Sequence, residues 1–145
     1  MQKLIITLAF SLILAGCESA KFSDNRAAEL DAADAILKQV DKNATASGIR
    51  FAFNIDHSRL AEEAGEVLDA SRVSFFTNPK VNSQILDNEI RAGLDLPYRI
   101  QVFYHQKRQQ VLFTNADFIK IRHGLKNLPV LKEFDRDISK LTEGL

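Results

Sequence analysis

The chain has one cysteine, one methionine and no tryptophan. The methionine is Met1 and the cysteine is Cys17, so everything after residue 17 lacks both a thiol and a thioether. Disulfide bonds, cysteine nucleophiles, iron–sulfur clusters and soft copper sites are therefore excluded from a domain built on the rest of the chain.

The chain also lacks a net charge, because 19 basic residues balance 19 acidic ones. This balance gives no support to general nucleic-acid binding, which needs an excess of positive charge. The charges are nevertheless unevenly placed. Six basic residues and one acidic residue lie in 98–126, whereas five acidic residues and one basic residue lie in 56–69. Such an asymmetry indicates either a solvated charged surface or a means of orienting a domain over anionic lipid headgroups.

No apolar run is long enough to span a membrane as a helix, which takes about 20 residues. The longest, at 4–14, contains apolar and hydroxyl residues and follows Lys3, as in a secretory signal peptide. Leu14-Ala15-Gly16-Cys17 then matches the lipobox of bacterial lipoprotein precursors, in which a diacylglycerol is attached to the cysteine and the chain is cleaved just before it. The alternative is an ordinary signal peptide that carries a cysteine near its end.

We therefore predict a lipoprotein signal peptide over 1–16, a lipidated tether over 17–23 and a single domain over 24–145. Because one acyl chain holds a protein on a membrane only weakly, lasting attachment through Cys17 needs at least two. The expected location is the cell envelope, outside the cytoplasm, on the periplasmic side of the inner or outer membrane.

Hydrophobic periodicity and turn residues predict the secondary structure of this domain. The expected helices span 24–46, 57–64, 79–93, 115–123 and 131–145, and the expected strands span 49–56, 72–77, 98–105 and 109–114. Asn78-Pro79 is typical of a helix start, and Gly48, Gly65, Gly93 and Gly124 follow helix-like patterns as stops. The order α-β-α-β-α-β-β-α-α predicts an α+β fold with one sheet of about four mainly antiparallel strands and helices packed on one face.

The first strand and the last helix predict the core. Phe51 and Phe53 occupy alternate positions of the strand, which places them on one face. Phe134 and Ile138 lie on an apolar stripe that continues at helical spacing to Leu145. We expect both strand phenylalanines, Phe134 and Ile138 to be buried.

Four short motifs occur in order along the domain. They are Phe53-Asn54-Ile55-Asp56-His57, Phe75-Phe76-Thr77-Asn78-Pro79-Lys80, Gly93-Leu94-Asp95-Leu96-Pro97 and His123-Gly124-Leu125. In these motifs the chain resembles the domain-of-unknown-function family 302, over about residues 25–125. The resemblance implies a small, often dimeric α+β sandwich with a sheet similar to TATA-binding-protein-like folds, and it carries no established catalytic residues. Members often open with a strand before the first long helix, where this chain offers only Lys21-Phe22.

The motifs supply four candidate ligand-binding residues, and each has a structural alternative. His57 either lines a pocket or packs at a strand end, and His123 sits where a helix dipole favours a cation. Burial of Asp95 in its apolar loop would raise its pKa toward a range useful for proton transfer, unless it caps nearby amides. Lys80, in the first turn of a helix, either helps the free amides to hold an anion or is a surface lysine.

Motifs for metal-dependent, nucleotide-dependent and nucleophilic catalysis are absent from the sequence. A zinc site made by His57 and His123 with Asp56 or Asp95 would require the fold to bring these residues together. We therefore expect no metal and no cofactor, and we assign no catalytic residue.

Two functions of different classes remain open. The first, which we favour, is a membrane-tethered module that binds a small ligand or an envelope protein and forms a homodimer through its sheet. The second is an envelope enzyme that uses His57 and Asp95, with His123 as a further candidate, for acid–base chemistry. That chemistry requires the three side chains to lie within about 10 Å of one another. A third, purely structural role as a spacer predicts no pocket.

Overall fold

The computed structural model describes residues 25–126 and 128–145. The predicted signal peptide, the lipidation site Cys17 and the predicted tether lie outside these residues. Within the described part of the chain, no helix has both the length and the apolar character needed to cross a membrane.

The helices and strands follow one another as the sequence patterns predict, with one addition. In chain order they are α1 (Asn25–Ser47), β1 (Arg50–Asp56), α2 (His57–Glu63), β2 (Ser71–Thr77), α3 (Pro79–Asn88), η1 (Ile90–Leu94), β3 (Tyr98–His105), β4 (Arg108–Phe113), α4 (Ala116–His123) and α5 (Pro129–Leu141). The addition is η1, a short 3-10 helix. The predicted α+β class, with one four-stranded antiparallel sheet, is confirmed.

Side-chain caps explain where two helices begin. Asp56 accepts a hydrogen bond of 2.9 Å from the backbone N–H of Arg59 and so caps α2. Asn78 caps α3 by accepting from the backbone N–H of Val81, and Pro79 occupies the first helical position. Each cap satisfies an amide that has no partner inside the helix.

Two helix ends show where a glycine does and does not act as a stop. Gly124 follows α4 with a φ of +62°, a left-handed conformation that glycine adopts without steric cost. The prediction that α3 continues to Gly93 is wrong, because the helix ends at Asn88. Glu89 is extended there, with a φ of −153°, and its carboxylate accepts from the backbone N–H of Arg91 to begin η1.

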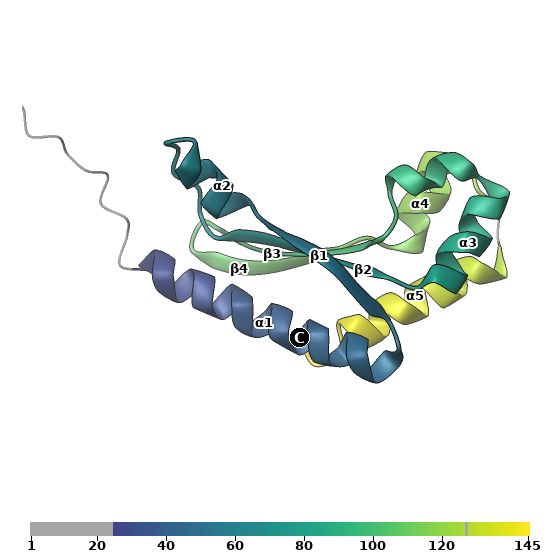
Figure 1. The fold of residues 1–145 in the computed structure, drawn as a ribbon, viewed down its shortest axis with the longest axis horizontal. Coiled ribbons are helices and arrows are strands. Elements are labelled where there is room, and N and C mark those ends of the chain that lie inside the picture. Colours follow the sequence, from purple (N-terminus) through teal and green to yellow (C-terminus); the bar gives the residue numbers. More distant parts are fainter. Residues whose placement is uncertain (1–24, 127) are drawn as a thin grey trace, which may run out of the picture.

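The strands lie in the order β1-β2-β3-β4, and every neighbouring pair is antiparallel. The hairpin between β3 and β4 has a two-residue turn at Gln106 and Lys107, both with positive φ. Figure 1 shows α1 and α5 beneath the sheet. Tyr98, Ile100 and Val102 of β3 point toward these helices and are fully buried.

The last helix supplies much of the core. Phe134 and Ile138 are 0% and 3% exposed, as predicted. The ring of Phe134 packs edge-on against Tyr98, with a centroid distance of 4.6 Å. The predicted stripe stops early, however, because α5 ends at Leu141 and Leu145 is exposed.

The prediction that Phe51 and Phe53 are buried is wrong, because they are 50% and 47% exposed. The register of β1 against β2 shifts at Ala52, so the two phenylalanines lie on opposite faces of the sheet instead of sharing one. Phe51 packs edge-on against Phe76 on the helix-covered face, and Phe53 stacks on Phe75 on the other face. Since β1 is an edge strand, neither ring is enclosed.

A buried carboxylate fastens three elements together. Asp137 on α5 is 6% exposed. Its Oδ2 accepts hydrogen bonds of 2.8 Å from the Tyr98 hydroxyl on β3 and from the side-chain amide of Asn78 at the start of α3. Burial and the hydrogen bond to Asp137 both raise the pKa of Tyr98, which therefore stays a donor at neutral pH.

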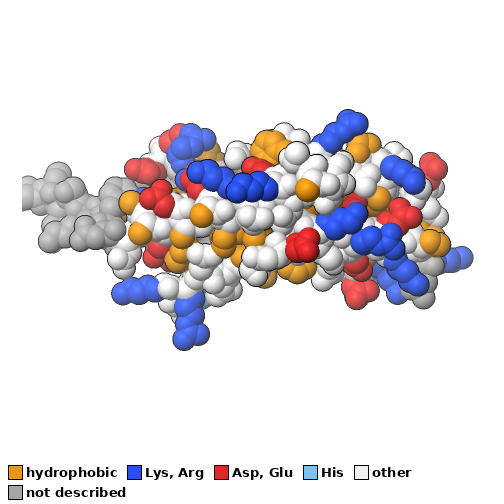
Figure 2. All heavy atoms as spheres, turned by 90° about the horizontal axis from the view of Figure 1, so that it is seen from below, with side chains coloured by type: hydrophobic (Ala, Val, Ile, Leu, Met, Phe, Trp, Pro, Cys, Tyr) orange, Lys and Arg blue, Asp and Glu red, His pale blue; other side chains and the backbone are white. Residues whose placement is uncertain are grey.

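The second face of the sheet, which we call the open face, is covered by neither α1 nor α5. In Figure 1, α2 rises at one end of this face and α4 at the other. Figure 2 shows the opposite, helix-covered side, where acidic and basic side chains are both spread over the surface. The main core contains residues from Val40 of α1 to Leu141 of α5, so the described residues have the features of an independently folding domain.

Candidate functional site

A groove of about 520 Å³ runs along the open face between α2 and α4. We call it the open-face groove. Its apolar lining comes from three strands and α4 and includes Ile55, Val73, Phe75, Leu112 and Phe118. Its polar lining includes His57, Arg99, Gln101, Thr114 and Asn115. A mainly apolar cavity with a few convergent polar groups is the usual form of a small-molecule site.

The strand register orders these residues along the groove. Ile55, Val73, Gln101 and Leu112 pair in turn and form one row across the four strands. Phe75 and Arg99 are paired two residues along, in the next row of the open face. β3 begins at Tyr98, shortly after η1 ends at Leu94. This second row therefore lies nearer to η1 and α4 than the first row does.

Asp95 holds a group of charged side chains together at the α4 end of the groove. This residue, directly after η1, is only 4% exposed. Its Oδ1 accepts a hydrogen bond of 2.8 Å from Arg99 Nη2. Its Oδ2 lies 2.8 Å from Arg122 Nε and 2.7 Å from His123 Nε2. Because a carboxylate can only accept, the imidazole nitrogen carries the hydrogen of that bond. We call these four residues the Asp95 cluster.

Two members connect the Asp95 cluster to the open-face groove. Arg99 lines the groove directly. The guanidinium of Arg122 lies 5.9 Å from the ring centre of Phe118, which also lines the groove. The charged cluster and the apolar lining therefore belong to one surface.

The expectation that burial raises the pKa of Asp95 is wrong. Burial does act to raise it, but hydrogen bonds from Arg99 and His123 and the positive charges of Arg122 and Arg99 outweigh that effect, so the pKa lies below its ordinary value. The carboxylate does not cap amides either, because its partners in the described chain are side chains. At neutral pH the carboxylate is therefore ionised.

The four candidates from the sequence do not all meet. Asp95 and His123 are in contact. His57 lines the groove from its α2 end, but no contact within the described residues joins it to Asp95 or His123. Lys80 is exposed on α3 and lies outside the groove lining.

Two residues of the cluster were missed by the sequence analysis. Arg99 follows Asp95 by four residues, and Arg122 stands next to His123 in the last motif. Their positions beside motif residues are the signal that was available.

Within the described residues, no three histidine, cysteine, aspartate or glutamate side chains lie together in a way that could hold a metal ion.

A second hollow, of about 550 Å³, lies between α1 and β1. Burial raises the pKa of Asp41, one of its lining residues. The hollow is mainly polar, and its partly buried arginine, Arg72, is already paired with Asp34 and Asp56. Two carboxylates face this one guanidinium, and the lining is more polar than that of the open-face groove. The open-face groove is therefore the better candidate for a ligand site.

A helical layer on one face of a four-stranded antiparallel sheet, with a groove on the other, defines a two-layer α+β domain. The family model described as "Domain of unknown function DUF302" matches residues 27–145, and the chain belongs to this family. The match includes α5, which lies beyond the four sequence motifs.

A solved structure has the same fold. The crystal structure of an uncharacterised conserved protein DUF302 from Bacillus stearothermophilus superposes with a TM-score of 0.60 and 16% sequence identity, over 76% of this chain and 84% of that chain. At this identity the likeness shows the fold alone. The comparison with curated proteins found no match.

Proposed function

We propose that this chain is a lipid-anchored protein of the cell envelope whose domain binds a small ligand in the open-face groove. The anchor rests on the lipobox that ends at Cys17. The ligand site rests on one observation: the Asp95 cluster lies at one end of an apolar groove on the face of the sheet that neither α1 nor α5 covers.

The exposure of the apolar lining supports an occupant. Leu112 and Phe118 are 55% and 46% exposed, and Phe53 beside the groove is 47% exposed. Soluble proteins rarely leave a contiguous apolar patch open to water unless it binds something. An apolar body placed in the groove would remove this surface from water.

Nile red, a neutral dye that fluoresces in apolar surroundings, tests the groove. We expect the domain, residues 25–145, to bind the dye, and Leu112→Lys to weaken binding by about tenfold because it puts a charge in the apolar lining. Ile121→Lys is the matched control, since Ile121 is apolar, 81% exposed and outside the groove lining. Absence of dye binding, or equal loss in both variants, would refute the groove as a ligand site.

A homodimer through the open face is the second candidate, and the charges at the two ends of the groove favour it. Near α2 the exposed side chains are mostly acidic: Glu62, Glu63, Glu66 and Asp69. Near α4 they are mostly basic: Arg91, Arg122 and Lys126. A twofold axis that lies in the plane of the interface and runs across the groove would place each end against the opposite charge of the partner.

Sedimentation equilibrium tests the dimer. If the open face is a dimer interface, the wild-type domain should be a dimer and Leu112→Lys a monomer, with Ile121→Lys as the control that remains dimeric. A monomeric wild type would leave the open-face groove free for a small ligand. A dimer that Leu112→Lys does not dissociate would show that the interface lies elsewhere.

A further inference from the structure

We infer that the ligand of the open-face groove is a single-chain amphiphile with a carboxylate head, bound with its head on Arg99 and its chain over Ile55, Val73 and Leu112 on the side of Arg99 toward α2. This inference rests on the proposed function, because it names the ligand class of the same groove.

Arg99 has hydrogen-bond donors left for a ligand. Its Nη2 donates to the carboxylate of Asp95 at 2.8 Å and to the backbone carbonyl of Asp95 at 3.1 Å. Nε and Nη1 donate to no other group in the described chain, and the side chain is 36% exposed in the groove. A guanidinium held on one side by a carboxylate presents its other donors in a fixed plane, which suits a second carboxylate.

The charge of the Asp95 cluster favours a monoanion. One carboxylate faces two guanidinium groups, so the cluster has an excess positive charge even when His123 is neutral. Glu89, a carboxylate that senses the charge of His123, is already paired with Arg91, and the hydrogen bond from Arg91 lowers its pKa to about 2. A single negative head at Arg99 would therefore balance the charge, whereas a neutral or cationic head would not.

The apolar row supplies the place for the chain of the amphiphile. Ile55, Val73 and Leu112 lie in the row next to Arg99, on the side toward α2, and the one polar member of that row, Gln101, donates to the Ser71 hydroxyl. Val73 is only 9% exposed, whereas Leu112 is 55% exposed, so the row combines an enclosed centre with an open edge. Each methylene buried there should tighten binding by about fourfold.

The N-terminus of α1 lies at the α2 end of the groove, so the predicted lipid anchor would bring the groove near a membrane, the expected source of amphiphiles. Arg26, in the first turn of α1, donates to the backbone carbonyl of Ser58 and to the carboxylate of Glu62, both on α2. The α2 end of the groove is thus the end at which α1 begins, where the predicted tether would join the domain. The predicted tether over 17–23 reaches at most about 25 Å at about 3.5 Å per residue, so a lipid at Cys17 would keep this end close to a membrane surface.

Competition with Nile red for the domain tests the head group. The three probes share an eight-carbon chain and differ in charge: octanoate, 1-octanol and octyltrimethylammonium. We expect octanoate to bind about tenfold more tightly than 1-octanol, because the neutral head lacks the charge-assisted hydrogen bonds, and the cation to bind most weakly.

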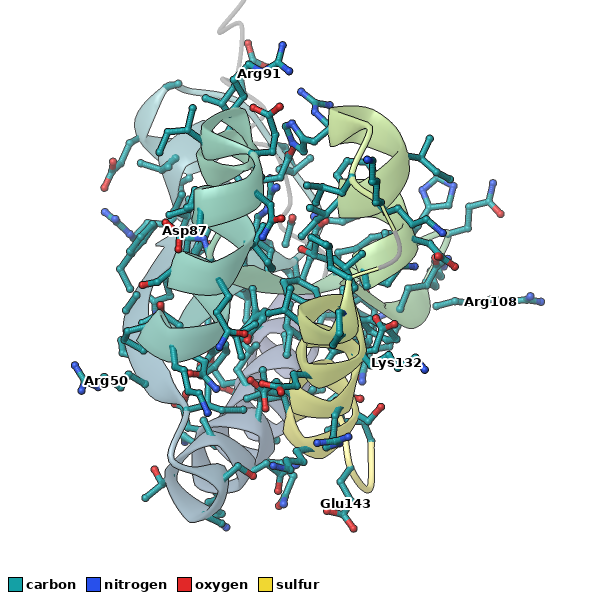
Figure 3. The ribbon with its side chains drawn as sticks, turned by 90° about the vertical axis from the view of Figure 1, so that its right-hand side faces the viewer. Arg50, Asp87, Arg91, Arg108, Lys132 and Glu143 are labelled. Atoms are coloured by element: carbon teal, nitrogen blue, oxygen red, sulfur yellow. The ribbon has the colours of Figure 1, made fainter. Side chains whose placement is uncertain are left out.

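Arg99→Gln should bring the affinity for octanoate down to that for 1-octanol and leave the affinity for 1-octanol unchanged. Arg99→Lys keeps the charge without the planar pair of donors, so octanoate should bind it with intermediate affinity. Arg50→Gln is the matched control: Arg50 is exposed, lies outside the groove lining and projects outward from the molecule in Figure 3. Octanoate should bind it as it binds wild type.

A second measurement needs no variant. The carboxyl carbon of ¹³C-labelled octanoate bound to the wild-type domain should titrate at a lower pH than that of free octanoate, because the guanidinium stabilises the ionised head. Equal affinities for octanoate and 1-octanol, or an unchanged titration of the bound carboxyl, would overturn the head-group inference while dye binding still supports the groove. If the dye itself does not bind, the proposed function fails as well.

Discussion

Asp95→Asn tests whether the Asp95 cluster is held together by charge. Asparagine has nearly the same shape but no negative charge, and its amide oxygen cannot replace both carboxylate oxygens. The bond to His123 should dominate the loss, because both side chains are about 7% exposed or less. A buried hydrogen bond to a charged group contributes about 1.5–3 kcal/mol. The pairs with Arg99 and Arg122, whose side chains are 36% and 55% exposed, are screened by water and should add about 1 kcal/mol together.

We therefore expect Asp95→Asn to lower the free energy of unfolding by about 3 kcal/mol, measured by urea denaturation with circular dichroism near pH 7. Asp117→Asn is the control, because it makes the same change at an exposed position in the first turn of α4. It should cost less than about 1 kcal/mol. A loss no larger than that of the control would mean that water already compensates the contacts of Asp95.

The pH dependence gives the same variant a second, independent signature. The pKa of Asp95 is lower in the folded protein than its ordinary value of about 4. Its ionised form therefore stabilises the fold fully above about pH 4, and this contribution is lost as the pH falls through the folded value. The difference between wild type and Asp95→Asn should be constant from about pH 7 to about pH 5 and shrink below about pH 4. A difference that already changes between pH 7 and pH 5 would assign the effect to another titrating group.

Three further predictions concern the anchor and the core. Cys17→Ala should yield unprocessed or soluble precursor, and an unchanged membrane fraction and mature mass would contradict the lipid anchor. Phe134→Ala should lower the free energy of unfolding by about 3–5 kcal/mol, whereas Phe53→Ala should lower it by about 1 kcal/mol because Phe53 is half-exposed. Equal losses in urea denaturation would contradict the assigned burial of the two rings. Tyr98→Phe should lower the free energy of unfolding by about 1.5–3 kcal/mol, because the buried carboxylate of Asp137 loses a donor. Tyr104→Phe is the control: the Tyr104 hydroxyl bonds to an exposed glutamine, so its loss should change the melting temperature little.

The helices and strands could be predicted because their signals are local. The caps at Asp56 and Asn78 and the stop at Gly124 act within one turn of the residues they affect. The burial of Phe51 and Phe53 could not be predicted in the same way. Strict alternation places them on one face, but the shift at Ala52 depends on how β1 pairs with β2. A change of one residue in register moves every later side chain to the other face.

The candidate site could be predicted in part. The motifs contain Asp95 and His123, and the fold brings these two residues into contact across 28 positions of the chain. Arg99 and Arg122 stood beside them in the sequence without any pattern that sets them apart from surface arginines. The direction of the Asp95 pKa depends on whether burial or charged partners prevail. Those partners become known only when β3 and α4 are placed in space.

The hydrogen bonds of the Asp137 carboxylate affect the kinetics with which a ligand binds in the open-face groove. It binds Tyr98 on the central strand β3 and Asn78 at the start of α3, and Tyr98 directly precedes Arg99. β3, which carries Arg99, is thus held in place on its helix-covered face by a buried network of hydrogen bonds. A groove floor held in this way exists before the ligand arrives, and little conformational entropy is lost on binding. Association should then proceed in a single kinetic phase, with an observed rate that rises linearly with ligand concentration and no slow rearrangement after encounter.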